Sequence, residues 1–171
     1  MSERIRSTAY WSTTVVVLFE LLAGGAWNLT RIDWVDAQLV HLHYPPYFAY
    51  VLGVAHLAAA VVIGLPGLGL LKEWAYAGIF LLWSGAAVSH LAVGDTLLSW
   101  GPPLMFLAFG VASWALRPAG RRPGPAPSTS RAWAGSVGLL VALTVVSFLS
   151  LPAADDFTSD WPKQRGWVTE Q

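Results

Sequence analysis

The sequence predicts an all-α fold, a polytopic membrane helical bundle of five transmembrane helices with no water-soluble domain. Three observations carry this prediction. Charged residues make up only 12% of the 171 residues and apolar residues 55%, whereas about 25% of an ordinary soluble domain is charged. Five stretches are apolar over the roughly 20 residues that a helix needs to cross a bilayer. The chain also contains ten Trp, and indole rings favour the membrane interface.

The five predicted spans are separated by residues that break helices. Pro45 and Pro46 precede the second span, and the stretch GLPGLGLLKE separates the second span from the third. Pro102 and Pro103 fall early in the fourth span, where a first-turn Pro loses little hydrogen bonding. In chain order the predicted spans are Tyr10–Leu29, Tyr47–Leu65, Trp74–Val93, Leu97–Leu116 and Ala132–Leu151.

The chain accordingly divides into a four-helix membrane domain at 1–118, a flexible linker at 119–131, a fifth transmembrane helix at 132–151 and an outer tail at 152–171. The linker is rich in Pro, Gly, Ser and Arg, which is typical of flexible segments. A basic start before the first apolar run resembles a signal peptide. However, Glu20 interrupts that run, and the run is longer than a signal core. We therefore expect the first span to be retained.

The distribution of basic residues predicts the orientation, because cytoplasmic segments carry an excess of Lys and Arg. With the amino terminus inside, the outer segments hold Arg31, Lys163 and Arg165. The inner segments then hold the larger group, which is Arg4, Arg6, Lys72, Arg117, Arg121, Arg122 and Arg131. We therefore expect a multi-pass protein of the cell membrane with a cytoplasmic amino terminus and a carboxyl terminus outside.

Several classes of function are excluded by what the sequence lacks. The absence of Cys rules out disulfides, thiolate nucleophiles and a dithiol relay, and with them a membrane thiol oxidoreductase. The basic residues are scattered and the formal net charge is zero, so we expect no nucleic-acid partner. There is no phosphate-binding Gly loop with Lys, no dinucleotide fingerprint, no His-Glu-x-x-His motif and no nucleophile elbow. We expect no cofactor.

Four segments give the chain a resemblance to the DoxX-like family of small bacterial membrane proteins. They are FELLAGG, HLHYPPYFAYVLGV, the stretch from LKEWAYAGIF through GAAVSHLAVGD, and WALRP. The resemblance spans about Tyr10 to Pro118. It implies a four-helix bundle with both termini inside, to which this chain adds a fifth helix, and an association with quinone-linked oxidoreductase complexes. The chain departs from the family pattern at His56, where Lys is frequent, at Leu82, where Asp is frequent, and at His43, where Gly is usual.

Glu20 and His56 are the candidate catalytic pair inside the membrane. Glu20 lies about 15 Å into the first span and His56 roughly 14 Å below the opposite surface in the second, at 1.5 Å per residue. Both side chains are therefore expected at the same depth near the midplane, where an ionisable group faces a partner or a wet cavity. They either handle a proton together or form a structural hydrogen bond between two helices.

A second group of polar residues converges at the outer side. His41, His43 and Tyr44, just before the second span, are candidate substrate-binding residues, and His90 and Asp95, at the end of the third, are candidate catalytic residues. The histidines follow no recognised ligand spacing, so we expect no metal site. The structural alternatives are that His90 bonds across helices, that Asp95 caps the fourth span, and that Tyr44 fixes the entry turn.

Three functions are compatible with these features. The first is an intramembrane pocket for a lipophilic molecule of quinone-like or isoprenoid-like type, in redox or lipid metabolism, with a membrane or peripheral oxidoreductase as a candidate partner. The second is a cofactor-free acid–base enzyme, an isomerase or cyclase, that uses Glu20 and His56. The third is a non-catalytic scaffold subunit, whose polar groups are purely structural.

Overall fold

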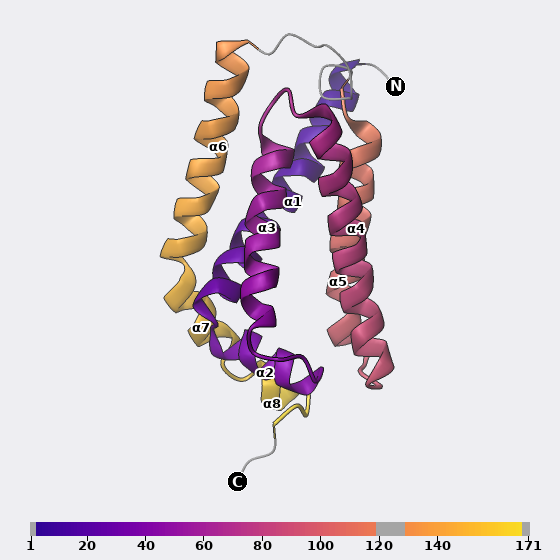
Figure 1. The fold of residues 1–171 in the computed structure, drawn as a ribbon, viewed down its shortest axis with the longest axis vertical. Helices are drawn as coiled ribbons and strands as arrows, with labels where there is room; N and C mark the ends of the chain where they lie inside the picture. Colours follow the sequence, from indigo (N-terminus) through magenta and orange to yellow (C-terminus); the bar gives the residue numbers. More distant parts are fainter. Residues whose placement is uncertain (1–2, 119–128, 169–171) are drawn as a thin grey trace.

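The computed structural model describes residues 3–118 and 129–168, and every regular element in these two ranges is a helix. Four helices form the central bundle, in which α1 packs against α3 and α5, and α4 packs against α3 and α5 (Figure 1). They are α1 (Glu3–Thr30), α3 (Phe48–Gly64), α4 (Gly69–Ala92) and α5 (Leu97–Leu116). The fold is therefore all-α, as the sequence predicts.

The remaining helices surround this bundle. Helix α6 (Ser130–Leu149) lies along the outside against α1 and α3. Three short helices gather at one end of the molecule, at the bottom of Figure 1. They are α2 (Asp33–His41), α7 (Leu151–Thr158) and α8 (Trp161–Gln164). We call this end, together with the α4–α5 loop, the cap end.

Four helices, α1, α4, α5 and α6, are long and apolar enough to cross a membrane, and they match four of the five predicted spans. The second predicted span corresponds to the shorter apolar helix α3, whose 17 residues extend about 25 Å. Helix α3 begins only after Pro45 and Pro46. It ends at Gly64, because Leu65 takes an extended conformation before Pro66.

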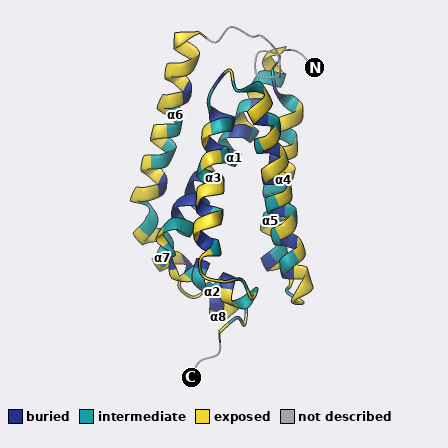
Figure 2. Ribbon diagram, in the orientation of Figure 1, coloured by how far each residue is buried: buried dark blue, intermediate teal, exposed yellow. Residues whose placement is uncertain are grey.

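Large apolar side chains cover the outward faces of these helices, which appear yellow in Figure 2. Leu81 on α4 is 69% exposed and Val141 on α6 is 56% exposed. Contiguous apolar surface of this kind is unfavourable in water and favourable in lipid. The chain is a multi-pass membrane protein with four candidate spans.

A close crossing of α1 and α3 sets the position of the intramembrane polar residues. A Cβ atom at Gly25 would lie 2.7 Å from Leu57 Cδ2, and one at Gly53 would lie 3.1 Å from the carbonyl oxygen of Gly25. The two backbones approach closely because neither position has a side chain, as is common where membrane helices pack. Glu20, on α1, therefore comes near α3.

Several buried polar side chains elsewhere in the bundle form hydrogen bonds between helices. Ser113 Oγ lies 2.7 Å from Thr14 Oγ1 and 2.8 Å from the hydroxyl oxygen of Tyr76, which joins α5 to α1 and α4. Lys72 is buried and donates to the carbonyl oxygens of Ile63, at 2.8 Å, and of Leu65. It thereby satisfies carbonyl groups at the carboxyl end of α3, which would otherwise have no partner.

Candidate functional site

Glu20 and His56 face each other inside the bundle. Glu20 Oε1, from α1, lies 3.8 Å from His56 Nε2, from α3. The side chains are 18% and 8% exposed, respectively. This distance is too long for a direct hydrogen bond but within reach of an ion pair or of a bridging atom. The proximity expected from their matched depths is present.

A backbone contact fixes the proton arrangement on His56. Its Nδ1 lies 2.7 Å from the carbonyl oxygen of Leu52. A carbonyl oxygen only accepts, so Nδ1 carries a proton and donates it. In the neutral ring, Nε2 then holds a lone pair directed toward Glu20. The pair therefore combines a fixed acceptor nitrogen with a carboxyl group.

Gly24 lies directly beside the pair, one turn after Glu20. A Cβ atom at this position would lie 3.3 Å from Glu20 Oε1 and 3.4 Å from His56 Nε2. A side chain at Gly24 would therefore intrude on both polar groups.

Trp83 of α4 is a third residue at this place, and the sequence analysis missed it. Its side chain is buried, and its indole NH interacts with the Glu20 carboxyl group without reaching hydrogen-bond geometry. Among the described residues, neither Trp83 Nε1 nor Glu20 Oε2 has a hydrogen-bond partner. The indole packs against Gly110 of α5, where a Cβ atom would lie 2.9 Å from Cζ3.

An apolar groove of about 320 Å³ leads away from His56 between α3 and α4. Its α4 wall extends from Leu71 to Leu82, which is about 16 Å along the helix axis. Leu21 of α1 also borders the groove, next to Glu20 in the chain. The site is therefore a long apolar groove with one polar end.

A larger groove of about 490 Å³ lies between α4 and α5, with Trp83 and Glu73 in its wall. The two carboxylate oxygens of Glu73 are already engaged. Trp114 Nε1 donates to one at 2.8 Å and Arg117 Nη2 donates to the other at 2.5 Å. The smaller groove is the better candidate, because His56 Nε2 has no hydrogen bond there.

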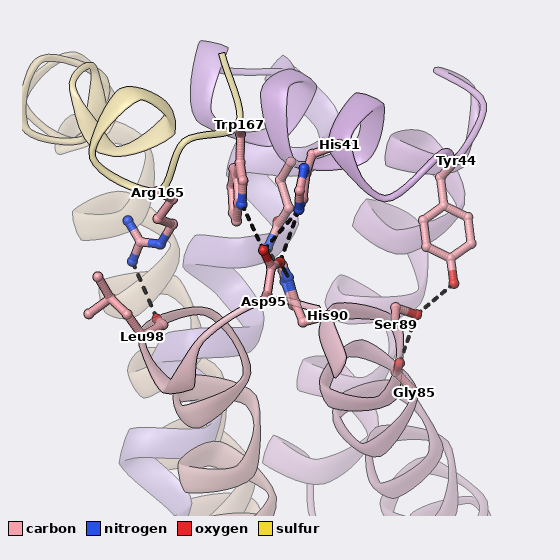
Figure 3. A network of polar contacts seen from close by, with 10 residues as sticks. His41, Tyr44, Gly85, Ser89, His90, Asp95, Leu98, Arg165 and Trp167 are labelled. Carbon is pink, nitrogen blue, oxygen red and sulfur yellow. Dashed lines mark hydrogen bonds and ion pairs between the residues drawn. The ribbon is translucent and has the colours of Figure 1, made fainter. Parts of the chain in front are cut away.

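A second polar cluster lies at the cap end, where Asp95 joins three elements (Figure 3). Its carboxylate accepts hydrogen bonds from His90 Nδ1 at 2.6 Å, His41 Nε2 at 3.0 Å and Trp167 Nε1 at 3.3 Å. Burial of the carboxyl group opposes its ionisation. The hydrogen bonds from His90, Trp167 and His41 outweigh this and hold the pKa of Asp95 below its usual value.

Aromatic stacking holds the tail against this cluster. The Trp167 ring stacks on His41 with centroids 4.8 Å apart and on His90 at 5.6 Å. Arg165 lies over the ring of Trp34, 4.7 Å from its centroid, and its burial lowers the pKa of the guanidinium. The tail is therefore docked on the cap end.

The other candidate residues at the cap end either form hydrogen bonds between elements or lie outside the cluster. The Tyr44 hydroxyl lies 2.8 Å from Ser89 Oγ and ties the α2–α3 turn to α4. His90 Nε2 accepts from Gln38 Nε2 at 3.0 Å, which is the expected bond across helices. His43 is exposed, has a φ of 61° and lies outside the cluster.

The structural alternative for Asp95 was wrong. Thr96 is the residue before α5, and no side-chain cap is present there. The Asp95 carboxylate turns to the two histidines instead, because a buried carboxylate gains more from several donors than from one exposed helix end. In the described part of the chain, no group of three or more His, Asp or Glu side chains is arranged to hold a metal ion.

Comparison with known proteins gives one match. Residues 12–113 match the DoxX-like family, and this region contains Glu20, His56, Trp83 and the four central helices apart from the start of α1 and the end of α5. Neither the curated proteins nor the solved structures that were compared gave a match. Because the matched region covers more than half of the chain, the protein belongs to the DoxX-like family.

Proposed function

We propose that this protein binds a lipophilic small molecule, quinone-like or isoprenoid-like, inside the membrane at Glu20 and His56. One observation carries the proposal. His56 borders an apolar groove, and its Nε2 faces Glu20 Oε1 across 3.8 Å with no hydrogen bond of its own. A mainly apolar cavity with a few convergent polar groups is the usual form of a small-molecule site.

The shape of the groove favours a molecule with a polar head and an apolar chain. The α4 wall between Leu71 and Leu82 is about 16 Å long, and the whole lining of the groove is apolar apart from His56 and the indole of Trp74. Leu71 and Trp74 are exposed on the surface that faces lipid. Such a molecule would enter sideways from the bilayer and place its head at Glu20.

The energetic argument points in the same direction. A buried polar group without a partner costs about 1–3 kcal/mol, and the cost of an ionisable group is higher in a membrane. A ligand that supplies hydrogen bonds to Glu20 and His56 would offset this cost. Relief of the unfavourable free energy of these unpaired groups would then add to the affinity for the ligand.

The proposal includes five membrane spans. They are the four long apolar helices and the shorter helix α3, which is the second span in chain order. Helix α3 lies within the bundle beside α1 and α4, and its 17 residues extend about 25 Å. The start of α1 and the tail helix α8 lie at opposite ends of the long axis (Figure 1). Together with the excess of basic residues at the α1 end, this supports an amino terminus inside and a carboxyl terminus outside.

A second candidate function is acid–base catalysis on such a molecule. The lone pair of His56 Nε2, fixed by the bond from Nδ1 to Leu52, would remove a proton from one carbon. The Glu20 carboxyl group would deliver a proton to another, which gives an isomerisation with no net change in protons or electrons. Catalysis requires that the molecule binds first. A protein that fails to bind such a molecule would therefore rule out both the binding function and the catalytic function.

Binding can be measured by titrating the purified protein in nanodiscs with decyl-1,4-benzoquinone and with farnesol. We expect Glu20→Gln and His56→Gln each to weaken the binding of at least one probe by about tenfold, the effect of losing roughly 1.4 kcal/mol. Ser84→Ala is the control, because the Ser84 hydroxyl bonds only to carbonyl oxygens of its own helix. Unchanged affinity together with lower thermal stability in both variants would indicate the scaffold function instead.

A further inference from the structure

We infer that Trp83 is the third polar contact of this site and that the molecule bound there is uncharged and presents an oxygen atom to Glu20, His56 and Trp83. The inference rests on the proposed function, since it specifies the chemistry of the head group. It assigns a binding role to a residue that the sequence does not single out.

Three polar atoms without hydrogen bonds meet at this place. Trp83 Nε1 and Glu20 Oε2 are buried and have no partner among the described residues, and His56 Nε2 has only the 3.8 Å contact with Glu20. Buried polar groups in folded proteins are nearly always satisfied. Because His56 Nε2 and the Trp83 indole NH both lie near the Glu20 carboxyl group, one polar group of a ligand could bond to all three.

The remainder of the bundle shows that poor packing is not the cause. Thr14 and Tyr76, from two other helices, both bond to Ser113 Oγ, at 2.7 and 2.8 Å. Lys72 donates to backbone carbonyl groups, among them that of Ile63. These buried polar side chains are thus paired across helices, whereas Glu20 Oε2 and Trp83 Nε1, which lie close to each other, are not.

The types of the three atoms define the ligand. An indole NH only donates, and His56 Nε2 accepts while Nδ1 donates to Leu52. A carboxyl group does either, according to its protonation. A hydroxyl oxygen could accept from Trp83 and donate to His56, and a carbonyl oxygen could accept from Trp83 and from protonated Glu20. An ammonium group only donates, so it would leave the Trp83 indole NH unpaired.

The packing of Trp83 fixes the direction of its donor. The Cζ3 and Cε3 edge of the ring lies against Gly110 of α5, with Cζ3 2.9 Å and Cε3 3.6 Å from the position of a Cβ atom there. Nε1 is on the opposite edge of an indole and is therefore turned toward α1, where it interacts with Glu20. The donor is held in place before any ligand arrives, which lowers the entropic cost of binding.

The test compares Trp83→Phe with the wild-type protein in nanodiscs, using three probes. Decyl-1,4-benzoquinone has carbonyl oxygens, farnesol has a hydroxyl group, and decylbenzene has no oxygen. We expect Trp83→Phe to weaken binding of the oxygen-bearing probes about tenfold and to leave decylbenzene unchanged. The melting temperature without probe should stay the same or rise, because the variant removes a buried donor that has no partner.

Two control variants separate this role from general effects of losing a tryptophan. Trp27 Nε1 is likewise buried without a partner, and Trp114 Nε1 donates to Glu73. Trp27→Phe and Trp114→Phe should not alter the affinity for any probe. As an independent measurement, the ten indole NH signals of ¹⁵N-labelled wild-type protein can be followed. One signal should move with the oxygen-bearing probes and remain fixed with decylbenzene.

The outcomes distinguish this inference from the proposed function. If Glu20→Gln and His56→Gln lose binding but Trp83→Phe retains full affinity, only the role of Trp83 is overturned. If Trp83→Phe weakens all three probes equally, or no indole signal responds to the oxygen-bearing probes, its NH is not a ligand contact. If wild-type protein binds none of the three probes, both proposals fail.

Discussion

His56 Nε2 lies 3.8 Å from Glu20 Oε1, while Nδ1 of the same ring donates to the carbonyl oxygen of Leu52 at 2.7 Å. The backbone contact orients the imidazole. Glu20 and His56 are thereby held at a distance at which a single ligand atom, placed beside them, could form a hydrogen bond with each. A purely structural pair would gain more by closing to a direct hydrogen bond.

Gly24 and Gly25 form a matched pair on α1. Gly24→Ala places a methyl group 3.3 Å from Glu20 Oε1 and 3.4 Å from His56 Nε2. We expect it to weaken probe binding severalfold while leaving stability unchanged or raising it by up to about 1 kcal/mol, because Ala favours helix over Gly. Titration with decyl-1,4-benzoquinone and a thermal melt measure both effects. Weaker folding with unchanged binding would contradict the prediction.

Gly25→Ala should have the opposite profile. Its Cβ atom would lie 2.7 Å from Leu57 Cδ2 and 3.4 Å from the carbonyl oxygen of Gly53, at the crossing of α1 and α3. Overpacking of this kind costs about 1–3 kcal/mol. A lower unfolding free energy than in Gly24→Ala is expected. Equal stability of the two variants would show that the crossing can relax.

Asp95 should control the docking of the tail. Asp95→Asn replaces the carboxylate that His90, His41 and Trp167 share by an amide with one oxygen acceptor. We expect faster amide hydrogen exchange in residues 161–168 and a loss of about 1–3 kcal/mol in docking free energy. Tyr44→Phe, which removes a hydroxyl bonded to Ser89 instead, is the control. Unchanged exchange in Asp95→Asn would contradict the assigned role.

The pH dependence of docking follows from the lowered pKa of Asp95. A carboxyl group with a lower pKa in the docked than in the undocked state stabilises docking above its ordinary pKa of about 3.9. This contribution is lost as the pH falls through the lowered value. Hydrogen exchange of the tail should therefore stay slow down to about pH 4 and accelerate below it. Undocking well above pH 5 would contradict the role assigned to Asp95.

The topology predicts that a reporter fused after Gln171 lies outside the cytoplasm. The proposed five spans and the excess of basic residues at the α1 end lead to this placement. A phosphatase that is active only outside and a fluorescent protein that folds only inside form a complementary pair of reporters. A cytoplasmic result would mean that one of the five helices, α3 or α6 in particular, does not span the membrane.

The sequence predicted the features that depend on apolar length and helical rise. Four spans agree with the structure, and simple depth arithmetic brought Glu20 and His56 together, because two antiparallel spans share one midplane. The same arithmetic overestimated the second span. The chain conformation at Pro45, Pro46 and Pro66 decides where α3 begins and ends, and hydropathy alone does not reveal it.

Contacts between distant segments were beyond the reach of the sequence. Trp167 stacks on His41 and His90, although 126 positions separate Trp167 from His41 by their numbers. Tryptophans were interpreted mainly as interfacial residues. Trp83 lies nine positions into the third predicted span and therefore away from the interface. This depth was the one feature of the sequence that pointed to the proposed binding role.

Family departures also gain a physical meaning. His43, where Gly is usual, has a φ of 61°, in the left-handed region that Gly adopts without strain. His56 and Leu82, where the resemblance leads us to expect Lys and Asp, both border the same groove. These positions are thus linked by structure even though they lie on different helices.

The central claim is that Glu20 and His56 bind a ligand as one unit, and a double-mutant cycle tests it most directly. The affinity for farnesol, whose hydroxyl group can donate to His56 Nε2 and accept from Glu20, is measured in the wild type, Glu20→Gln, His56→Gln and the double variant. We predict that each single change weakens binding about tenfold and that the double change adds little, because residues that share one ligand group are not additive. Affinities that are equal in all four proteins, or losses that simply add, would contradict the account.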